Sequence, residues 1–415
     1  MLNAISILPM QLMTRGGKLS FMLKELGDKY GPLVRVGPNE VLFGDADTYR
    51  RISAVRSDFT KGPWYELAKV VPDQHSLFSM RDDEQRKELR AKLSEGYAGR
   101  DNGGFEPGID KMVAQFVDLV ESKYVSTVTD YRPIEFSHKS QYFALDVIGQ
   151  LAFGEALGFL ANDEDLWGYV STNDQVFPAL ALMLNIPHVG IMMQRWPFSK
   201  LLPFSSDDIA GSDSTATAIR MTMLCLLNTP ASLNGLRREI DAAISQGRIS
   251  SPITDVEARE LPHLQAVIKE GIRMYPPSTG LNYKQVAKGG AELCGYFLPE
   301  GTQLGVNIQK LMRSKETFGI DADVFRPERW LEAAADEQRF KEMSDVVELA
   351  FGYGRFQCLG KTIAYMELNK IFVELLRRFD FAVVKPQEPL NLYDAAFWVT
   401  TDFWLRVTRR PDTGA

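Results

Sequence analysis

The stretch FGYGRFQCLGK, from Phe351 to Lys361, combines several glycines with one of only three cysteines in the chain. A helical pattern follows it directly, and Arg377 and Arg378 stand near the far end, where a helix dipole favours cations. Cys358 therefore lies at the N-terminal end of the predicted helix. This helix is expected to run to about Phe379, with apolar positions at Ile363, Ala364, Met366, Leu368, Ile371, Phe372, Leu375 and Leu376.

This placement gives the Cys358 thiol a particular setting. Free backbone N–H groups and the helix dipole stabilise a thiolate, so we expect the pKa of the thiol to be lowered. Gly352, Gly354 and Gly360 carry no side chains, so the backbone can wrap closely around the sulfur. The pattern therefore leaves room for a flat ligand beside the thiolate.

Three interpretations of Cys358 stay open at this point. The first is a buried structural cysteine in a turn. The second is a nucleophile, which needs a histidine base, and we expect the four histidines to lie at the surface or at helix ends. The third is a metal ligand. No CxxC or paired Cys/His spacing suits zinc, whereas a single thiolate suffices as the fifth ligand of a haem iron. The histidines are His75, His138, His188 and His263.

Length, charge and cysteine content narrow the class of protein. The 415 residues carry a net charge of −7, so the chain is not built to coat nucleic acid. Three widely separated cysteines predict no disulfide framework and a reducing compartment. The N-terminal apolar run is broken by Pro9 and ends by Met13, short of the roughly 20 residues that a spanning helix needs. We expect a soluble chain that rests at most on a membrane surface.

The pattern along the chain is mostly helical, with small sheets at both ends. It predicts one mainly α domain of the α+β class over residues 1–415, without the βαβ alternation of a dinucleotide-binding fold. Glycine and proline positions predict a hairpin over 32–45, strands over 291–307 and a last strand pair over 397–410. Helices are predicted over residues 144–160, 206–228 with Ser206 as the N-cap, 232–247 and 262–275.

The spacing F-x-x-G-x-x-x-C-x-G, met by Phe351, Gly354, Cys358 and Gly360, resembles the signature of the cytochrome P450 family, the haem-thiolate monooxygenases. The resemblance implies that family's fold and a heme b whose iron takes Cys358 as its axial ligand. Residues 351–360, Gly352 among them, would form the haem-binding loop, and Arg355 would contact a haem propionate. Phe356 stands where the family often has Arg or His. This form of the loop resembles a fungal branch related to pisatin demethylase.

The segment KEGIR places Glu270 and Arg273 one helical turn apart, on the face opposite the predicted core positions. Taken alone, it indicates an exposed i,i+3 pair. The resemblance makes it the family's E-x-x-R pair, joined by Arg329 of the later segment FRPERW. A carboxylate held between two guanidiniums suits their planar fork. The implied role of the three is structural, to hold the segment that carries Cys358.

The segment AGSDST resembles the family's oxygen-activating helix. Small Ala210 and Gly211 would leave room for dioxygen above the haem. Asp213 and the Ser214 hydroxyl match the acid–alcohol pair that handles protons, and Thr215 completes the set of candidate catalytic residues. Most family members carry threonine at the Ser214 position. Without the resemblance, the segment is typical of a capped first turn of a helix.

The basic segment EQRKELR resembles the helix whose W/H-x-x-x-R pair binds a haem propionate, with Arg86 in the aromatic place and Arg90 in the arginine place. Together with Lys87 and Lys92, these residues would give a basic face for an acidic reductase. Without the resemblance, the segment is an ordinary solvated helix face.

We expect two parts of the family pattern to be absent from this sequence. One is the N-terminal anchor of members at the cytosolic face of the endoplasmic reticulum, so we expect a cytoplasmic or peripheral membrane protein. The other precedes Ala210, where residues 197–209 form a short link in place of several helices. We therefore expect a lid region that is cut short and a distal side open to water.

The preferred hypothesis is a monomeric haem-dependent monooxygenase of fungal secondary metabolism. Its substrates would be O2 and an apolar small molecule, such as a terpenoid, polyketide or aromatic. NADPH would supply electrons through a separate reductase. An impaired remnant that binds haem without a complete pocket is the alternative, and a haem-free cysteine-nucleophile enzyme is a third. Expected pocket contributors are the region before Met80, residues 278–283 and residues 397–399.

Overall fold

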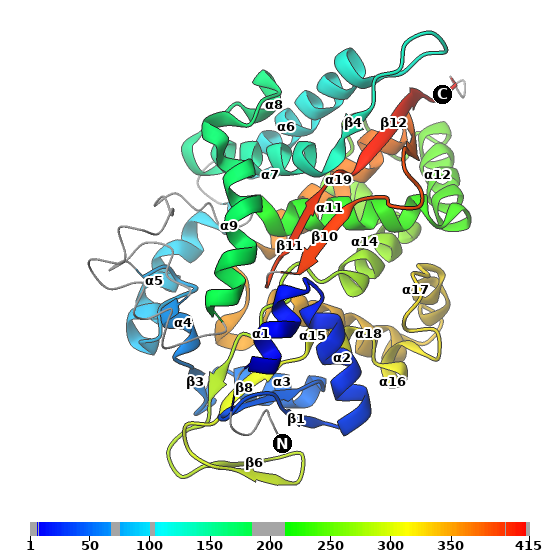
Figure 1. Cartoon of the computed structure of the whole chain (residues 1–415). Coiled ribbons are helices and arrows are strands. Elements are labelled where there is room, and N and C mark those ends of the chain that lie inside the picture. Colours follow the sequence, from blue (N-terminus) through cyan, green and yellow to red (C-terminus); the bar gives the residue numbers. More distant parts are fainter. Residues whose placement is uncertain are drawn as a thin grey trace.

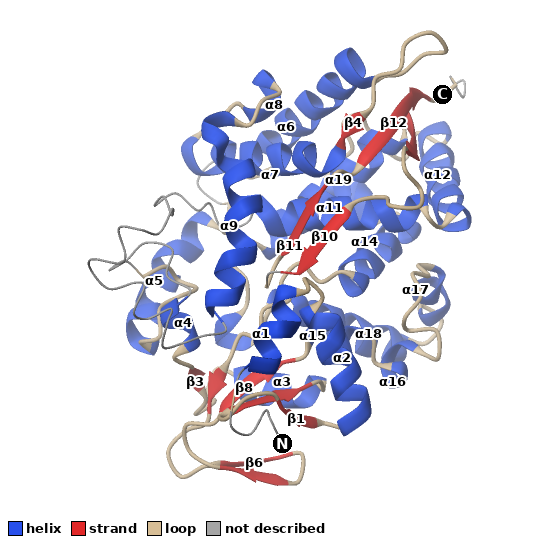
Figure 2. Ribbon diagram, viewed as in Figure 1, coloured by secondary structure: helices blue, strands red, loops and turns tan. Residues whose placement is uncertain are grey.

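The computed structural model describes residues 6, 8–67, 75–99, 104–184, 212–394 and 396–411. Helices make up most of this part of the chain, and short strands gather into small sheets (Figures 1 and 2). The predicted fold class, mainly helical with small sheets, is confirmed.

Helices occur along the whole described length of the chain. In the first half they are α1 (Leu8–Arg15), α2 (Leu19–Tyr30), α3 (Ala46–Ser53), α4 (Trp64–Leu67), α5 (Asp83–Gly96), α6 (Glu106–Leu119), α7 (Phe136–Phe153), α8 (Phe159–Asn162) and α9 (Tyr169–Leu184). In the second half they are α11 (Ser212–Leu227), α12 (Pro230–Ser245), α13 (Asp255–Arg259), α14 (Pro262–Met274), α15 (Ile308–Met312), α16 (Lys315–Phe318), α17 (Glu328–Ala333), α18 (Glu337–Val347) and α19 (Lys361–Leu376).

The strands form two sheets and two hairpins. The larger sheet has the order β1-β2-β8-β5-β3, and its β2–β8 pair is parallel. A three-stranded sheet has the order β4-β12-β9, and β6-β7 and β10-β11 are antiparallel pairs. The bounds are β1 (Leu33–Arg35), β2 (Glu40–Phe43), β3 (Thr60–Lys61), β4 (Ile134–Glu135), β5 (Lys284–Gln285), β6 (Ala291–Leu293), β7 (Tyr296–Leu298), β8 (Gln303–Val306), β9 (Phe379–Val383), β10 (Asn391–Asp394), β11 (Trp398–Thr401) and β12 (Trp404–Arg409).

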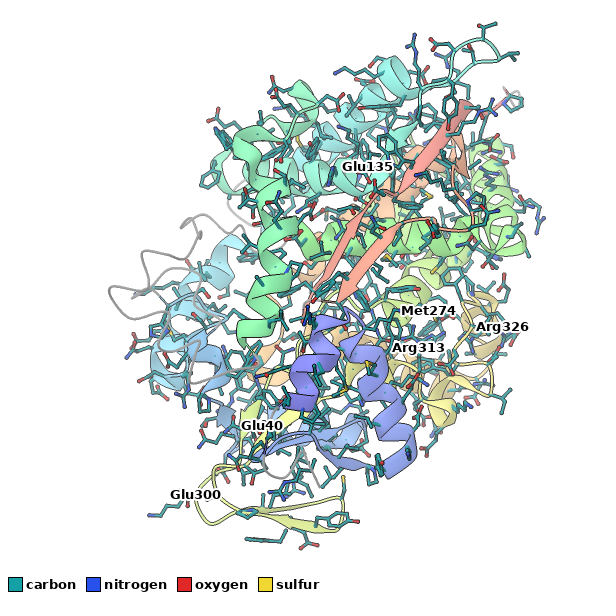
Figure 3. The ribbon with its side chains drawn as sticks, viewed as in Figure 1. Glu40, Glu135, Met274, Glu300, Arg313 and Arg326 are labelled. Atoms are coloured by element: carbon teal, nitrogen blue, oxygen red, sulfur yellow. The ribbon has the colours of Figure 1, made fainter. Side chains whose placement is uncertain are left out.

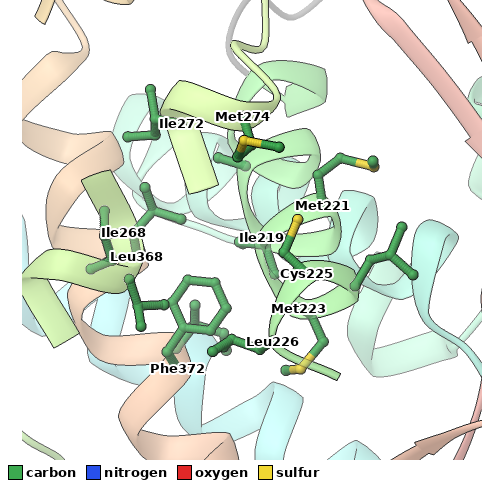
Figure 4. Packing of buried hydrophobic residues seen from close by; sticks show 14 of the residues in the cluster. Ile219, Met221, Met223, Cys225, Leu226, Ile268, Ile272, Met274, Leu368 and Phe372 are labelled. Carbon is green, nitrogen blue, oxygen red and sulfur yellow. The ribbon is translucent and has the colours of Figure 1, made fainter. Parts of the chain in front are cut away.

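The main core lies where α11, α14 and α19 pack together, and α7 packs along α11. Figure 4 shows the apolar side chains that these helices contribute to it. Each fully buried side chain of this kind stabilises the fold by about 1.5–3 kcal/mol. The packing fixes α19, which follows the Cys358 loop, against α11, which begins at Ser212. Members of the cluster include Ile219, Met223, Leu226, Ile268, Ile272, Leu368 and Phe372.

Several sequence predictions about local structure are confirmed. The chain turns between β1 and β2 within the predicted hairpin. Strands β6, β7 and β8 lie in the predicted range, and the turn between β6 and β7 contains Cys294 and Gly295, both at positive φ. Helix α14 begins at Pro262 as predicted, because proline at the first helical position lacks only an N–H that would have no partner there.

The helix predicted over residues 144–160 is wrong in its bounds. Helix α7 begins earlier, at Phe136, where the Glu135 carboxylate accepts the His138 backbone N–H. It ends at Phe153 because Gly154 adopts a left-handed conformation with φ of 82°. The apolar pattern continues past this glycine, so the pattern alone placed the end too far along the chain.

The strand pair predicted for the C-terminal tail is also wrong. Strands β11 and β12 both form, but β11 pairs with β10 while β12 pairs with β4 and β9. Between them, Phe403 is fully buried, and its N–H donates to the Glu135 carboxylate at 2.9 Å. Figure 3 labels Glu135 beside the tail strands. This anchoring turns the chain from one sheet into the other.

Other differences are smaller. Helix α19 ends at Leu376 rather than near Phe379, because Phe379 begins β9. The predicted Ser206 cap and the link over 197–209 lie outside the described residues, which resume at Ser212. Among the described residues, no helix has the length and apolar character needed to cross a bilayer.

The close packing of α14 on α11 generates a first prediction. A Cβ at Gly271 would overlap the Thr222 side chain, so Gly271→Ala should destabilise the protein by about 1–3 kcal/mol. Urea denaturation measures this loss. Gly96→Ala is the control, because a Cβ at Gly96 meets nothing within 4 Å. Adding Thr222→Ala should restore part of the loss, and an unchanged midpoint for Gly271→Ala would contradict the packing argument.

Candidate active site

The loop before α19 is closed on itself. The Cys358 N–H donates to the Phe351 carbonyl at 2.7 Å, which joins the two ends of the stretch. Gly352 and Gly354 adopt positive φ, and a Cβ would lie 2.6 Å from Phe356 O in one case and 2.5 Å from Ser53 O in the other. These two glycines are therefore required by backbone contacts, not by the sulfur as the sequence suggested.

Gly360 has a different setting. It is the N-cap of α19 with φ of −80°, and a Cβ there would lie 3.9 Å from the Cys358 Sγ, at ordinary contact distance. Of the three glycines in the loop that sequence analysis singled out, this is the one that adjoins the thiol. The helix N-terminus also begins here, as predicted.

The Cys358 thiol is accessible to solvent, but protein atoms surround much of it. This partial burial raises the pKa of the thiol, while the Gly360 N–H, the Arg90 guanidinium and the Lys361 N–H act to lower it. The net shift is upward, so the expectation of a lowered pKa is wrong for the protein alone. The helix N-terminus reduces the cost of a thiolate without outweighing desolvation.

The Glu270 carboxylate lies between two guanidiniums. Arg273 donates to it at 2.7 and 2.9 Å and Arg329 at 3.0 Å, and the Trp330 indole N–H donates at 2.9 Å. All three charged side chains of this clamp are fully buried. Burial alone would raise the pKa of Glu270, but the two arginines reverse this and hold it below its ordinary value.

The prediction that Glu270 and Arg273 face away from the core is wrong. The chain around Met312 and Ala322 covers that face of α14. Arg273 donates to the carbonyls of both residues. Next to it, Arg313 donates to the Met274 carbonyl at 2.7 Å, and both residues are labelled in Figure 3. Arg326, labelled in the same view, donates its backbone N–H to Glu270.

The clamp is connected to the Cys358 loop through the chain between them. Helix α18 follows α17 and leads into a 3-10 turn over Glu348–Phe351. Glu348 accepts the Tyr365 hydroxyl at 3.0 Å and pairs with Lys361, both of α19. The Phe351 ring lies 5.2 Å from the Tyr365 ring. The start of the loop is thus fixed to the helix that follows it.

Three arginines hold the loop from the other side. Arg86 donates to the Arg355 carbonyl at 2.7 Å, and Arg90 donates to the Gln357 carbonyl at 2.6 Å. Arg355 pairs with Asp83 at 3.2 Å and donates to the Ser57 carbonyl. Arg86 is buried, so its expected place on a basic surface is wrong. The structure thus brings the three predicted arginines to the Cys358 loop.

The predicted oxygen-side residues begin α11. Asp213 accepts a hydrogen bond from Gln141 of α7 at 2.5 Å, and Thr215 is buried. Ser214 lies in the same first turn of the helix. Ala210 and Gly211 lie outside the described residues. The sequence does not indicate Gln141, because nothing in its local pattern marks it as the partner of a residue 72 positions away.

A cluster of charged side chains lies next to Asp213. His138 contacts Asp174 of α9 at 3.1 Å, and the hydrogen bond with Asp174 raises the pKa of His138 despite partial burial. Arg220 of α11 is fully buried and donates to the Trp398 carbonyl at 2.8 Å. His138, one of the four histidines predicted to lie at the surface or at a helix end, thus forms an ion pair between α7 and α9.

The expected pocket contributors are partly brought together. Ser278 and Phe397 form an isolated antiparallel bridge, and the Trp398 indole N–H donates to the Pro276 carbonyl. Trp398 is buried against Tyr275, at 5.8 Å between rings. Packing within the protein therefore explains why Trp398 is buried, and this burial does not require a ligand.

The residues around Cys358 fit a haem. Within the described part of the chain, no three His, Cys, Asp or Glu side chains form a metal-binding group, so a metal at this loop would depend on one thiolate. A macrocycle that supplies four ligands of its own needs only that. The accessible sulfur at a helix N-terminus, beside several arginines, suits a group that carries iron and acidic side chains.

Comparisons with known proteins give the family. A family model described as Cytochrome P450 matches residues 208–402. Cytochrome P450 monooxygenase ABA1 of Pyricularia oryzae is 36% identical over 432 residues, covering 91% of this chain and 84% of the relative. The chain belongs to the cytochrome P450 family. Cytochrome P450 monooxygenase aba1 of Botryotinia fuckeliana is 34% identical and covers 96% of this chain and 89% of its own.

The solved structure of a cytochrome P450DA mutant heme domain has the same fold. Its TM-score is 0.74 at 15% identity, with 95% of this chain and 93% of that chain covered. The curated relatives named above are cytochrome P450 monooxygenases, and on that similarity this chain is a P450 monooxygenase. The alignment with ABA1 extends over 432 positions, which is more than the 415 residues of this chain. The relative therefore carries residues within the aligned region that this chain lacks.

The buried clamp generates a second prediction. Glu270→Gln keeps the shape of the side chain but leaves two buried guanidiniums without their carboxylate, so the P450 should lose about 3–5 kcal/mol of stability. Urea denaturation, with the yield of soluble protein, checks this. Glu332→Gln on α17, the helix that carries Arg329, is the control, because its pair with Arg326 is exposed and worth less than about 1 kcal/mol. Equal losses in the two variants would contradict the role given to the clamp.

The His138–Asp174 pair generates a third prediction, for pH dependence. The folded pKa of His138 is raised, so its contribution to stability is present below about pH 6.5 and is lost as pH rises through the folded pKa. The wild type should therefore lose part of its stability between pH 6 and pH 8. Urea midpoints at the two pH values measure this. His138→Gln should reduce the difference, because Glu135 and Asp174 then face a side chain that does not titrate. An unchanged difference would exclude His138 as its source.

Proposed function

We propose that this P450 binds heme b, whose iron Cys358 would hold, and inserts one atom of O2 into an apolar small molecule of fungal secondary metabolism. The observation that carries the proposal is the Cys358 loop. It presents an accessible thiol at the N-terminus of α19 and is braced by Glu348 on one side and by Arg86 and Arg90 on the other. When bound, the haem supplies the oxygen-activating iron.

The residues on the Cys358 side of the site bind the haem iron and hold the loop in place. Cys358 would hold the iron, and its thiolate would supply electron density to it. Arg86, Arg90 and Arg355 hold the loop at the position where the haem would bind. Glu270, Arg273 and Arg329 keep the preceding segment rigid.

On the opposite side, Asp213 and Ser214 hold and move protons, and Thr215 supports them. The hydrogen bond from Gln141 orients the Asp213 carboxylate. Ala210 and Gly211 would leave space for dioxygen next to this pair.

The substrate class and the partners belong to the same proposal. The substrate is apolar, such as a terpenoid, polyketide or aromatic, since the segments expected to line the pocket are aromatic and aliphatic. Electrons come from NADPH through a separate reductase that docks on the exposed basic residues Lys87 and Lys92. The P450 works as a monomer, as one domain, in the cytoplasm or at a membrane surface such as that of the endoplasmic reticulum.

One observation favours a second candidate, an impaired P450 that binds haem without a complete substrate pocket. The relative ABA1 contains residues within the aligned region that this chain lacks. Loss of lid helices would admit water to the oxygen side and favour release of reduced oxygen over substrate oxidation.

A fourth prediction tests both candidates. The P450, expressed with haem supply, reduced and exposed to carbon monoxide, should show the long-wavelength Soret band of thiolate ligation. Cys358→His should lose that band. Folded wild type without the band, or a Cys358→His variant that keeps it, would overturn the assignment.

Turnover then separates the two candidates. With a reductase and apolar candidate substrates, an active P450 gives oxidised product, whereas an impaired one consumes NADPH and releases peroxide. Ser214→Ala should shift an active P450 toward peroxide.

A further inference from the structure

Two exposed serines lie in the loop that joins α12 to α13, and one of them faces the arginines that follow α19. Residues 248–252 of this loop lie at the surface, with Ile249 partly covered, and Ile253 directly after them is fully buried. The Ser251 hydroxyl accepts a hydrogen bond from the Arg378 guanidinium at 3.1 Å. Neither the P450 signature nor the proposed chemistry gives this contact a role.

Arg377 and Arg378 both reach the loop from the C-terminal end of α19. Arg377 donates to the Ser250 carbonyl at 2.8 Å, directly before Ser251. The two ends of the Arg378 fork have different partners, since Nη1 donates to the buried Glu374 carboxylate and Nη2 donates to Ser251. The Arg378 side chain is 33% exposed, so it remains accessible to a group attached to the Ser251 oxygen.

Ser250 lies beside Ser251 but faces an anion. Its hydroxyl donates to the Glu257 carboxylate at 2.6 Å, and its backbone N–H donates to the same group at 3.1 Å. Burial would raise the pKa of Glu257, but hydrogen bonds from Ser250 and Thr254 lower it to about 2, so this carboxylate is charged at neutral pH. A phosphate on Ser250 would meet that charge, whereas a phosphate on Ser251 would meet guanidiniums.

The residues around Ser251 form a pattern that a protein kinase can recognise. Pro252 follows the serine directly, and the exposed Arg248 stands three positions before it. Kinases select their substrates partly by such neighbouring residues. The proline indicates the class of kinase that requires proline directly after the phosphorylated serine.

We infer that Ser251 is a phosphorylation site, and that Arg377 and Arg378 bind the phosphate once it is attached. A proline-directed kinase transfers the γ-phosphoryl group of ATP to the Ser251 oxygen. The Oγ–P bond forms, the bond between the γ-phosphorus and its bridging oxygen breaks, and ADP and the hydroxyl proton are released. The inference goes beyond the proposed function, because it requires neither haem nor substrate.

The phosphate would strengthen a connection that the loop already has with α19. Ile253 donates its N–H to Glu374 at 2.8 Å, and its carbonyl accepts from the fully buried Lys370. A phosphoserine carries close to two negative charges and three acceptor oxygens, so guanidiniums bind it through charge-assisted hydrogen bonds. Phosphorylation therefore holds residues 250–254 more firmly on the helix that carries the Cys358 loop at its other end.

One contact opposes this effect. Glu374, only 2% exposed, pairs with Arg377 and Arg378, and a phosphate competes for the same guanidiniums. Arg378 uses different nitrogens for Glu374 and for Ser251, so it can keep both partners. If the phosphate instead displaced Glu374, a buried carboxylate would lose its cations and the protein would lose stability. The direction of the stability change therefore tests the inference.

The first experiment measures phosphorylation of the native chain. The purified full chain is incubated with ATP, Mg²⁺ and a proline-directed kinase, and mass spectrometry should find the phosphate on Ser251. Ser251→Ala should remove it, and Ser245→Ala, which changes an exposed serine at the end of α12, should leave it in place.

A peptide of residues 244–258 serves as the reference for this kinase. If the peptide is modified and the native chain is not, the folded loop is closed to the kinase and the inference is overturned. A peptide that is not modified on Ser251 overturns it as well, because the pattern is then not recognised.

The second experiment measures the effect of the phosphate itself. Phosphoserine is placed at position 251 during translation, so that the choice of kinase does not matter. The urea midpoint should rise, and the amides of Ile253 and Thr254 should exchange about tenfold more slowly, as expected for charge-assisted hydrogen bonds. A midpoint that stays the same or falls would mean that the phosphate gains no net contact or displaces Glu374, and it would overturn the inference.

Arginine variants assign the effect to its contacts. Each variant is compared with and without the phosphate, so that the cost of losing the arginine itself cancels. Arg378→Gln should remove most of the gain, and Arg377→Gln should remove part of it. Arg259→Gln is the matched control, because Arg259 pairs with Asp255 on α13 and is 53% exposed. An equal effect of Arg259→Gln would show that only long-range charge acts, and it would exclude the arginine contacts.

A measurement on the phosphate keeps the inference testable where the arginine variants do not fold. Free phosphoserine loses its second proton with a pKa of about 6. Two guanidiniums favour the dianion, so the ³¹P resonance of the phosphorylated wild type should titrate below that value, even with Glu374 and Glu257 nearby. A phosphate that titrates at about 6 or above is not bound by Arg377 and Arg378, and this result overturns the inference.

Discussion

The buried ion pairs of Glu270 with Arg273 and Arg329 are the interaction on which the part of the P450 around the Cys358 loop depends. A buried ion pair is costly to form, and it persists only when every donor and acceptor is satisfied. In this clamp the guanidiniums also donate to carbonyls of the 312–324 segment, and Trp330 donates to the carboxylate. One charged centre thus ties α14 to α17 and to the irregular chain between them. Removing it would leave uncompensated cations in the core.

The Cys358 loop inherits its rigidity from that centre. The chain leaves α17, passes through α18 and enters the loop at Glu348, which is bonded to α19. From the opposite side, Arg86 and Arg90 of α5 bond to carbonyls within the loop. The thiol therefore sits on a backbone held at both ends, which is what a metal ligand needs if its position is to be fixed before the metal binds. Arg86 and Arg355 also lie over the Phe356 ring, so this bracing concentrates positive charge beside the loop.

The opposite side of the site depends on helix packing. Helix α11 lies along α7, and Gln141 reaches Asp213 across that contact. His138, one turn before Gln141, reaches Asp174 of α9. A single face of α7 thus contacts one acidic side chain on α11 and another on α9.

Sequence alone determined the features that depend on local chemistry. The Cys358 spacing, the proline start of α14 and the turns that bound β1, β2 and β6 to β8 are each specified by a few neighbouring residues, because turn and cap geometry restricts which residues fit. Sequence also identified Glu270, Arg273 and Arg329 through a resemblance. It placed the first two on an exposed face, since periodicity does not show a second layer of chain. Only the tertiary structure decided that they are buried and that the tail strands join different sheets. It also revealed that Lys61 and Lys284, far apart in the sequence, face each other. Such contacts depend on which distant segments meet, and no local pattern records that.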